Sequence, residues 1–173
     1  MSEHKSKTDI LVCNYSPVIM TLKVKIRKAI SADAATIADF NIAMAWETEG
    51  KKLSPDKIGA GVQALFGKPE YGFYIVAEVD GQVAGCLMLT YEWSDWRNGL
   101  FWWIQSVYVK PEFRRQGVYR DMFSYVKELA GKNPAVCGCR LYVEHDNIIA
   151  QETYKRLGME ATHYRMFEEI FHE

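Results

Sequence analysis

The chain has 173 residues, of which 49% are hydrophobic and 25% are charged, and its formal net charge is -1. This length and balance suit one domain with one hydrophobic core. The near-neutral charge gives no general attraction to nucleic acid or to an anionic membrane, and no apolar run reaches the ~20 residues of a membrane span. We therefore expect no nucleic-acid or membrane partner, and any anion site must be local.

The cysteines and the first 22 residues indicate a reduced, cytoplasmic protein. Cys137 and Cys139 lie two apart on one expected strand, which is poor geometry for a disulfide, and a Cys-Gly-Cys pair alone is weak for zinc. The leader lacks the apolar core and cleavage site of a signal peptide. We expect residues 1–22 to be an N-terminal extension, residues 23–173 to form a single domain, and no metal to be bound.

The N-terminal part of the domain is predicted to contain a strand and two helices. Apolar and charged residues alternate over 23–29, as in a half-buried strand. Ser31 is a suitable cap for a helix that Gly50 ends, and Ser54 begins a second helix that Gly67 closes.

A β-hairpin is the clearest local prediction. Asp80-Gly81 separates two strand-like runs, and both turn positions favour positive φ. The expected strands cover 72–79, 82–91 and 100–109, with a loop or hairpin end over 92–99. The C-terminal part is predicted to form a helix over 117–130, a strand over 136–143, a helix over 147–157 and a strand-like tail over 161–171. This order predicts an α/β (α+β) fold with a single mixed, mostly antiparallel sheet and flanking helices.

The most basic short window lies between the third of these strands and the next helix. Its basic residues are Lys110, Arg114, Arg115 and Arg120. A helix N-terminus presents unpaired N–H groups and the positive end of a dipole, and Gly117 lets a diphosphate approach the backbone. The glycine patterns of Rossmann and P-loop sites are absent. The window fits a diphosphate, and an ordinary basic turn is the alternative.

The helix over 147–157 carries Ala150, Tyr154 and Leu157 on one face. Taken alone, Tyr154 could be a buried aromatic side chain of an amphipathic helix. A tyrosine hydroxyl is protonated at neutral pH, so the same residue could also act as a general acid.

Three segments together resemble the GNAT family of N-acetyltransferases. Residues 114–119, Arg-Arg-Gln-Gly-Val-Tyr, are similar to its Gln/Arg-x-x-Gly-x-Gly/Ala signature, and 105–112 resemble the strand that leads into it. Residues 147–159 resemble a second motif of that family, in the right order. Tyr119 departs from the usual glycine or alanine, so its side chain must point away from the diphosphate or narrow the site.

The resemblance implies an acyl-CoA N-acyltransferase fold, in which two central parallel strands splay apart around the pantetheine arm of acetyl-CoA. By position, the backbone of Val107, Tyr108 and Val109 would pair with the pantetheine amides. Asn147 would contact the arm or shape its channel, and Tyr154 would protonate the departing thiolate. The diphosphate would be held by the loop of Arg114, Arg115, Gln116, Gly117, Val118, Tyr119 and Arg120.

The resemblance also implies direct attack by an amine on the thioester, with a backbone N–H of the splayed strand stabilising the oxyanion. A base must take the proton of the amine, and the candidate carboxylates are Glu47, Glu49, Glu92 and Glu144. Cys86 lies mid-strand among apolar residues, so it is expected to be an inert core residue and not an acyl carrier.

Aromatic residues cluster where the acyl acceptor would bind. Segments 91–96 and 101–103 hold four of the five tryptophans. Aromatic faces and carboxylates suit an organic cation. The residues expected to contact the acceptor are Glu47, Glu92, Trp102 and Glu144. We expect a primary amine on a small, cationic molecule; the alternative is that the tryptophans only pack the hairpin against the sheet.

Other functions stay open beside an acetyl-CoA-dependent N-acetyltransferase. Tyr119 favours a non-catalytic acyl-CoA-binding module on the same fold. A nucleotide-binding module could use the basic loop for ATP or NAD, and a structural interaction domain would use neither. A homodimer is a further expectation from the resembled family, and acetyl is favoured over a longer acyl group.

Overall fold

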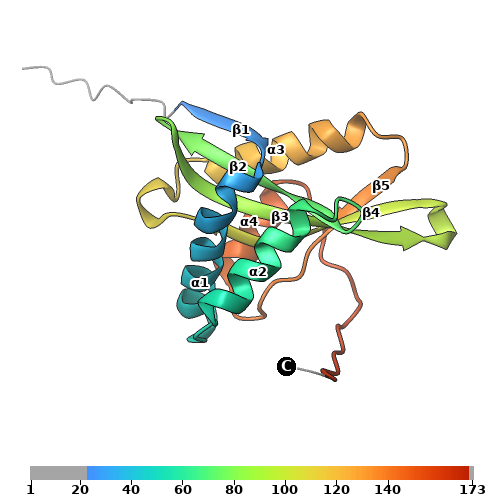
Figure 1. Ribbon diagram of the computed structural model, residues 1–173. Helices are drawn as coiled ribbons and strands as arrows, with labels where there is room; N and C mark the ends of the chain where they lie inside the picture. Colours follow the sequence, from blue (N-terminus) through green and yellow to red (C-terminus); the bar gives the residue numbers. More distant parts are fainter. Residues whose placement is uncertain (1–22, 172–173) are drawn as a thin grey trace, which may run out of the picture.

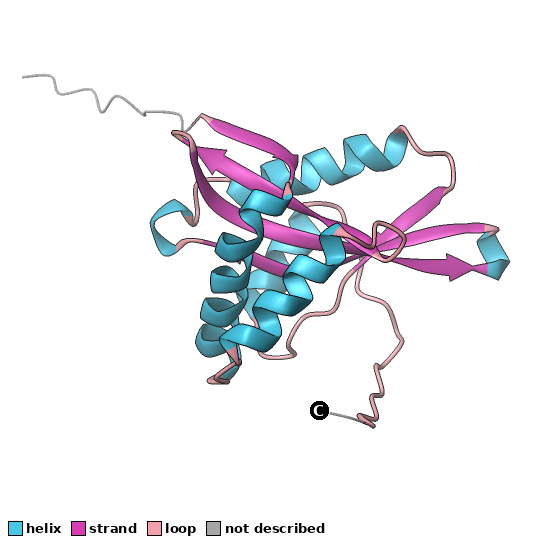
Figure 2. Ribbon diagram, viewed as in Figure 1, coloured by secondary structure: helices cyan, strands magenta, loops and turns pink. Residues whose placement is uncertain are grey.

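The structure is a computed structural model that describes residues 23–171, and the expected extension over 1–22 lies outside them. A five-stranded sheet in the order β1-β2-β3-β4-β5 forms its centre (Figures 1 and 2). The strands are β1 Val24–Lys28, β2 Gly72–Val79, β3 Gln82–Ser94, β4 Gly99–Val109 and β5 Val136–Arg140. The helices are α1 Ala34–Glu49, α2 Pro55–Phe66, α3 Val118–Gly131 and α4 Ile148–Arg156.

Helices cover both faces of the sheet, α1 and α2 one face and α3 the other (Figure 1). The core on the α1–α2 face includes Ile37, Phe40, Val62, Val76 and Cys86. The core on the α3 face includes Ile75, Leu87, Leu89, Met122 and Val126. Neighbouring residues of β2 and β3 thus belong to opposite cores, as the alternation of a strand requires. The predicted mixed sheet with flanking helices is confirmed.

Strands β1 to β4 pair antiparallel, whereas β4 and β5 are parallel. The β2–β3 turn is Asp80-Gly81 with φ of 51° and 78°, the positive values that a two-residue hairpin needs. The Ser54 hydroxyl accepts the Lys57 N–H at 3.4 Å at the start of α2, and Gly50 ends α1 in the left-handed conformation. These local predictions are confirmed.

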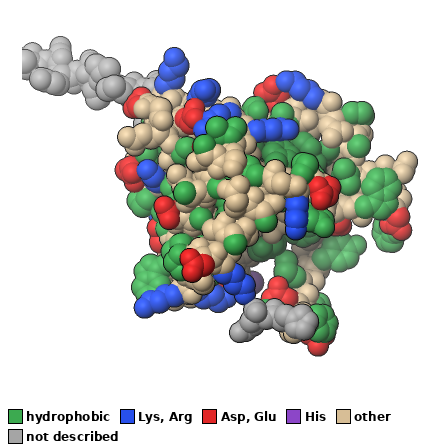
Figure 3. Space-filling model, in the orientation of Figure 1, with side chains coloured by type: hydrophobic (Ala, Val, Ile, Leu, Met, Phe, Trp, Pro, Cys, Tyr) green, Lys and Arg blue, Asp and Glu red, His purple; other side chains and the backbone are tan. Residues whose placement is uncertain are grey.

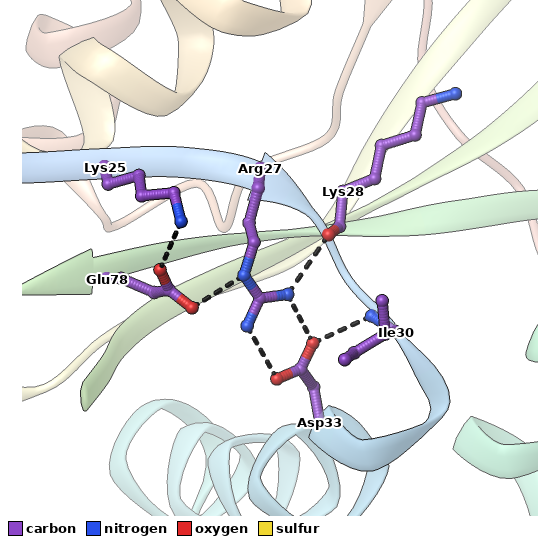
Figure 4. Close-up of polar contacts among 6 residues, drawn as sticks. All are labelled: Lys25, Arg27, Lys28, Ile30, Asp33 and Glu78. Atoms are coloured by element: carbon purple, nitrogen blue, oxygen red, sulfur yellow. Dashed lines mark hydrogen bonds and ion pairs between the residues drawn. The ribbon is translucent and has the colours of Figure 1, made fainter. Parts of the chain in front are cut away.

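An ion-pair cluster joins β1 to β2 and to the start of the first helical segment (Figure 4). Arg27 donates to both carboxylate oxygens of Asp33, at 2.7 and 2.9 Å, and to Glu78 at 2.6 Å. Asp33 is 7% exposed, and its carboxylate also accepts the Ile30 N–H at 2.8 Å. The hydrogen bonds from Arg27 hold the pKa of Asp33 below its usual value. The cluster therefore links the edge strand β1 to β2 and to the residues that precede α1.

Four features differ from the prediction. Ser31 does not cap α1, because it opens a short 3-10 segment over Ser31–Asp33 and α1 begins at Ala34. β3 extends through 92–94, which pair with 99–101 of β4, and only 95–97 form a short 3-10 turn. β5 ends at Arg140, where its pairing with β4 stops. The expectation of a strand over 161–171 is wrong, because these residues form no helix or strand and have no partner strand within the described part of the chain.

Candidate active site

β4 and β5 run side by side only over the first residues of β4, which pair with the full length of β5. Their last paired positions are Trp103 and Arg140, after which β4 continues to Val109 and β5 ends. Within residues 23–171, the stretch 104–109 has no strand beside it on that edge, so its outward backbone groups are open to a ligand. The predicted parting of the parallel strands is confirmed. Val107, Tyr108 and Val109 all lie on this open stretch.

A β-bulge at Ser106 interrupts the open stretch. Cys86 pairs with Tyr108 but Met88 pairs with Gln105, so β4 has one extra residue there, and Ser106 adopts a φ of 49°. The bulge directs the Tyr108 ring toward α1, with its centroid 5.0 Å from that of Phe40. Bulges re-aim side chains and leave a ladder position unpaired, and they are common next to active sites.

The basic loop between β4 and α3 has the backbone of an anion-binding turn. Arg115 and Gly117 both have positive φ, 62° and 86°, and Gly117 caps α3. A Cβ on Gly117 would lie 2.7 Å from the Arg120 guanidinium. Left-handed residues next to a helix N-terminus turn successive N–H groups toward one point, which suits phosphate. The loop therefore fits the diphosphate of acetyl-CoA, with the side chains of Arg114, Arg115, Gln116 and Arg120 exposed around it.

Arg114 ties this loop to the C-terminal end of α1. Its guanidinium donates to the Glu47 carboxylate at 2.7 Å and to the Val109 carbonyl at 2.7 Å. The Tyr108 hydroxyl donates to the same carboxylate at 3.0 Å. Burial, followed by the bond to Glu47, raises the pKa of Tyr108. Glu47 is therefore held by two side chains and positions the loop.

The side chain of Tyr119 points into the protein. Its ring stacks on Phe123, with centroids 6.2 Å apart and planes at 14°, and meets the Tyr154 ring edge-on at 5.6 Å. Its hydroxyl is buried and has no hydrogen-bond partner. Burial raises the pKa of Tyr119 well above its usual value. The residue that departs from the family signature thus leaves the diphosphate side of the loop clear.

α4 holds Tyr154 against α3, close to the start of that helix. The Tyr154 side chain is half-buried, and burial raises its pKa, so the hydroxyl is protonated at neutral pH. Two buried polar atoms lack a hydrogen-bond partner among the described residues, and the Tyr154 hydroxyl is neither of them. Asn147 caps α4 by accepting the Ala150 N–H at 3.0 Å. Its side chain therefore sets where the helix that carries Tyr154 begins.

A polar cluster lies where β4 and β5 part, on the sheet face that α1 and α2 cover elsewhere. Glu92 accepts hydrogen bonds from the Trp103 indole and from the Arg140 guanidinium. The Tyr142 ring lies 6.2 Å from that of Trp103, and its hydroxyl donates to Gln105 at 3.4 Å. We call these five residues the Glu92 cluster. Only Glu92 was expected from the sequence, although Arg140 and Tyr142 alternate at the end of a predicted strand and so share a face.

The tryptophans divide between core and surface. Trp102 is 5% exposed and packs edge-on against Phe73 in the core on the α3 face. It therefore faces away from the Glu92 cluster, and Trp103 has the position that was expected for Trp102. Trp93 and Trp96 are 59% and 85% exposed on the projecting β3–β4 hairpin, so they do not pack it against the sheet.

The junction of α1 and α2 contributes basic side chains near the same face. A shallow pocket there is lined by Ile42, Trp46, Lys51, Lys52 and Leu53. The Lys52 ammonium lies 5.8 Å from the centre of the Trp46 ring, so that aromatic face already meets a cation. The Lys51 ammonium donates to the Glu49 carboxylate at 2.5 Å, and this bond raises the pKa of Lys51.

Cys86 is wholly buried, and burial raises the pKa of its thiol to about 12. The thiol is therefore protonated at neutral pH and is a poor nucleophile.

Among the described residues, no group of three or more His, Cys, Asp or Glu side chains could hold a metal ion. Over the same residues, no helix is long and apolar enough to cross a membrane. Acidic and basic side chains are mixed over the face in Figure 3.

Residues 37–159 match the model of the acetyltransferase (GNAT) family. This chain belongs to the GNAT family. The match spans the parting strands, the basic loop and α4, which are the parts that the sequence motifs indicated. The chain is therefore an acetyl-CoA-dependent N-acetyltransferase, and GNAT enzymes use acetyl-CoA as co-substrate.

Individual relatives agree with the family. Thialysine N-epsilon-acetyltransferase of Bos taurus is 31% identical over 150 residues, which cover 78% of this chain and 83% of the relative. The crystal structure of a "possible acetyltransferase" from Clostridium difficile 630 has 47% identity and a TM-score of 0.80, covering 86% of this chain and 99% of that one. The crystal structure of a predicted acetyltransferase with acetyl-CoA from Clostridium acetobutylicum shares the fold, with a TM-score of 0.69 and 15% identity. The match covers 84% of this chain and 96% of that one.

Proposed function

We propose that this GNAT enzyme moves the acetyl group of acetyl-CoA to the primary amine of a small, cationic molecule by direct attack, with Tyr154 as the general acid. The observation that carries the proposal is that Tyr154, in the second family motif, lies on α4 against the start of α3 with a hydroxyl that burial keeps protonated. Its ring lies 5.6 Å from that of Tyr119, which is in the first turn of the helix that the basic loop begins. The loop would hold the diphosphate, at the other end of the pantetheine arm from the thiol, so the assignment of Tyr154 as proton donor to the departing thiolate rests on its motif position and on its protonated phenol.

Acetyl-CoA supplies the acetyl group as a reactive thioester. The N–H groups of residues 114–120 would hold its diphosphate, with the exposed Arg115 and Arg120 adding charge. The open backbone of residues 107–109 would pair with the pantetheine amides. A backbone N–H near the Ser106 bulge would stabilise the oxyanion that forms during attack.

The carboxylates near the site differ in how they are bound. Glu47 is held by Arg114 and Tyr108, and Glu92 is held by Arg140 and Trp103. Within the described residues, the Glu144 side chain is exposed and makes no ion pair at hydrogen-bond distance. We therefore assign removal of the proton from the amine to Glu144, acting through water, and binding of the acceptor to the Glu92 cluster.

The Glu92 cluster combines both signs of charge with two aromatic rings. Trp103 and Tyr142 offer aromatic faces for a cation, and the Glu92 carboxylate joins the Trp103 indole to Arg140. Arg140 could in turn pair with a carboxylate of the acceptor. A basic amino acid presents both groups. The name of the bovine relative, which specifies an amine of thialysine, supports a small acceptor of this kind.

The test is loss of the acetyl-CoA thioester, followed by its absorbance, with a panel of amines at equal concentration. The panel contains lysine, thialysine, a polyamine, an aminoglycoside, a neutral amine and an anionic amine. We expect the basic amino acids to be the best acceptors. Turnover of the neutral or anionic amines alone would contradict the cationic acceptor. Binding of acetyl-CoA without turnover of any amine would favour a non-catalytic module.

A further inference from the structure

The helix that carries Tyr154 has little support of its own. None of the residues of α4 is fully buried, and Ile148 and Ile149 are 59% and 84% exposed. The contacts toward the body of the protein come from Tyr154, Leu157 and, just beyond the helix, Met159. The Tyr154 side chain, which is the proposed proton donor, is therefore held in place by few neighbours.

Tyr119 is the neighbour that meets the Tyr154 ring directly. The two rings are 5.6 Å apart at 66°, an edge-to-face contact. Tyr119 is itself fixed from behind, because it stacks on Phe123, which is 4% exposed in the core on the α3 face. A rigid path of three rings thus runs from the core through α3 to α4.

We propose that the ring of Tyr119 is a positioning residue for Tyr154, so that the position where the GNAT signature has glycine or alanine fixes the general acid in this chain. The inference rests on the proposed role of Tyr154. It also explains why a large side chain is accommodated in the loop: the ring turns inward, and the diphosphate side keeps only backbone.

The ring, and not the hydroxyl, carries this role. The Tyr119 hydroxyl is buried with no partner among the described residues, an arrangement that is unfavourable for a polar group. A hydroxyl that bonds to nothing cannot orient Tyr154, whereas an edge-to-face contact survives its removal. Tyr119→Phe therefore keeps the proposed function of the residue, and Tyr119→Ala removes it.

The experiment compares Tyr119→Phe and Tyr119→Ala, each in the wild-type chain and in Tyr154→Phe. Steady-state kcat and the KM for acetyl-CoA are measured with the best acceptor of the panel, and circular dichroism checks folding. We expect Tyr119→Phe to keep kcat. We expect Tyr119→Ala to lower kcat by about 10- to 100-fold, the effect of a displaced catalytic group, without raising the KM for acetyl-CoA. In the Tyr154→Phe background, Tyr119→Ala should have almost no further effect.

Three results would overturn the inference. The first is an unchanged kcat in Tyr119→Ala, and the second is an equal loss of kcat in both backgrounds, which would mean that Tyr119 does not act through Tyr154. The third is a loss in Tyr119→Phe as large as in Tyr119→Ala, which would assign the effect to the hydroxyl. An unchanged kcat in Tyr154→Phe would instead contradict the role of Tyr154 as general acid in the proposed function. That variant is measured without any change at Tyr119, so the two failures can be told apart.

Discussion

The two sides of the sheet differ in how fully their backbone ladders and arginine side chains are paired. On the β1–β2 side the ladder is unbroken from Val24 to Lys28, and Arg27, with 24% of its side chain exposed, is bonded to two carboxylates. On the β4–β5 side the ladder stops at Trp103, and Arg114, with 40% of its side chain exposed, is bonded to one carboxylate and belongs to a loop with open N–H groups. One side is complete without a ligand, and the other leaves groups for one. Changes on the first side should alter stability, and changes on the second should alter catalysis.

The largest expected effect is on the open side. Tyr154→Phe removes the proton donor but keeps the ring and its contact with Tyr119. We expect kcat to fall by about 10²- to 10⁴-fold, as for loss of a general acid, with the thermal midpoint nearly unchanged. Steady-state kinetics and thermal unfolding measure the two quantities. Tyr71→Phe is the matched control, because Tyr71 is 60% exposed outside the proposed site and should change kcat little.

The loop glycine should separate donor affinity from stability. Gly117→Val places a β-branched residue at a φ of 86° and brings a Cβ to 2.7 Å from the Arg120 guanidinium. We expect the KM for acetyl-CoA to rise by at least about tenfold, equivalent to about 1.4 kcal/mol, because the backbone can no longer approach the diphosphate. Gly131→Ala is the control, since a Cβ there meets nothing within 4 Å. Equal KM values in the two variants would contradict the role of the loop.

On the closed side, Arg27→Met should lower the free energy of unfolding by about 2–3 kcal/mol. The substitution leaves the Asp33 carboxylate, 8% exposed as a side chain, without its cation. Lys25→Met is the control, because Lys25 is 73% exposed and its pair with Glu78 should be worth less than about 1 kcal/mol. Urea titration measures both. A loss of kcat at a temperature where Arg27→Met is folded would break the proposed separation of the two sides.

The same cluster predicts a loss of stability in acid. Hydrogen bonds from Arg27 lower the pKa of Asp33 below its ordinary 3.8, and they lower that of Glu78 as well. A carboxylate with a lowered folded-state pKa stabilises the fold above its unfolded pKa and loses that contribution as the pH falls through the folded value. The stability advantage of the wild type over Asp33→Asn should therefore be full at pH 7 and decline below about pH 4. An advantage that is constant from pH 7 to pH 2.5 would contradict this linkage.

The smallest effect is expected at the acceptor. Glu92→Gln keeps the shape of the side chain but removes the charge that faces Arg140 and Trp103. We expect the KM for a cationic amine to rise by about three- to fivefold with kcat nearly kept, since a half-exposed ion pair contributes less than about 1 kcal/mol. Asp95→Asn, on the exposed hairpin turn, should leave the KM unchanged.

Local patterns in the sequence predict much of this fold because their causes are local. A serine cap, an Asp-Gly turn and a terminal glycine act within a few residues, and they set the start of α2, the hairpin turn and the end of α1. The basic loop and the helix of Tyr154 were predictable for the same reason. The family resemblance then supplied the parting of the parallel strands, which no local pattern encodes.

The rest depends on contacts between distant segments. A glycine at position 106 would have indicated a β-bulge, but Ser106 gives no such signal. The bulge shifts the pairing of β4 with β3, and this shift decides which residues of β4 face α1. Trp102 and Trp103 cannot be told apart in a continuous aromatic run, although only Trp103 reaches Glu92. The inward turn of Tyr119 likewise depends on Phe123 and on a helix that lies 35 residues later in the chain.

The burial of Cys86 gives the protein an internal chemical reporter. Its thiol is 0% exposed in β3, the strand in the middle of the sheet, and should stay unmodified by a thiol reagent while the fold is intact. Cys137 is exposed and should react at once. The delayed labelling of Cys86 in a background where Cys13, Cys137 and Cys139 are serine would then record how often the centre of the molecule opens, without a probe being added to it.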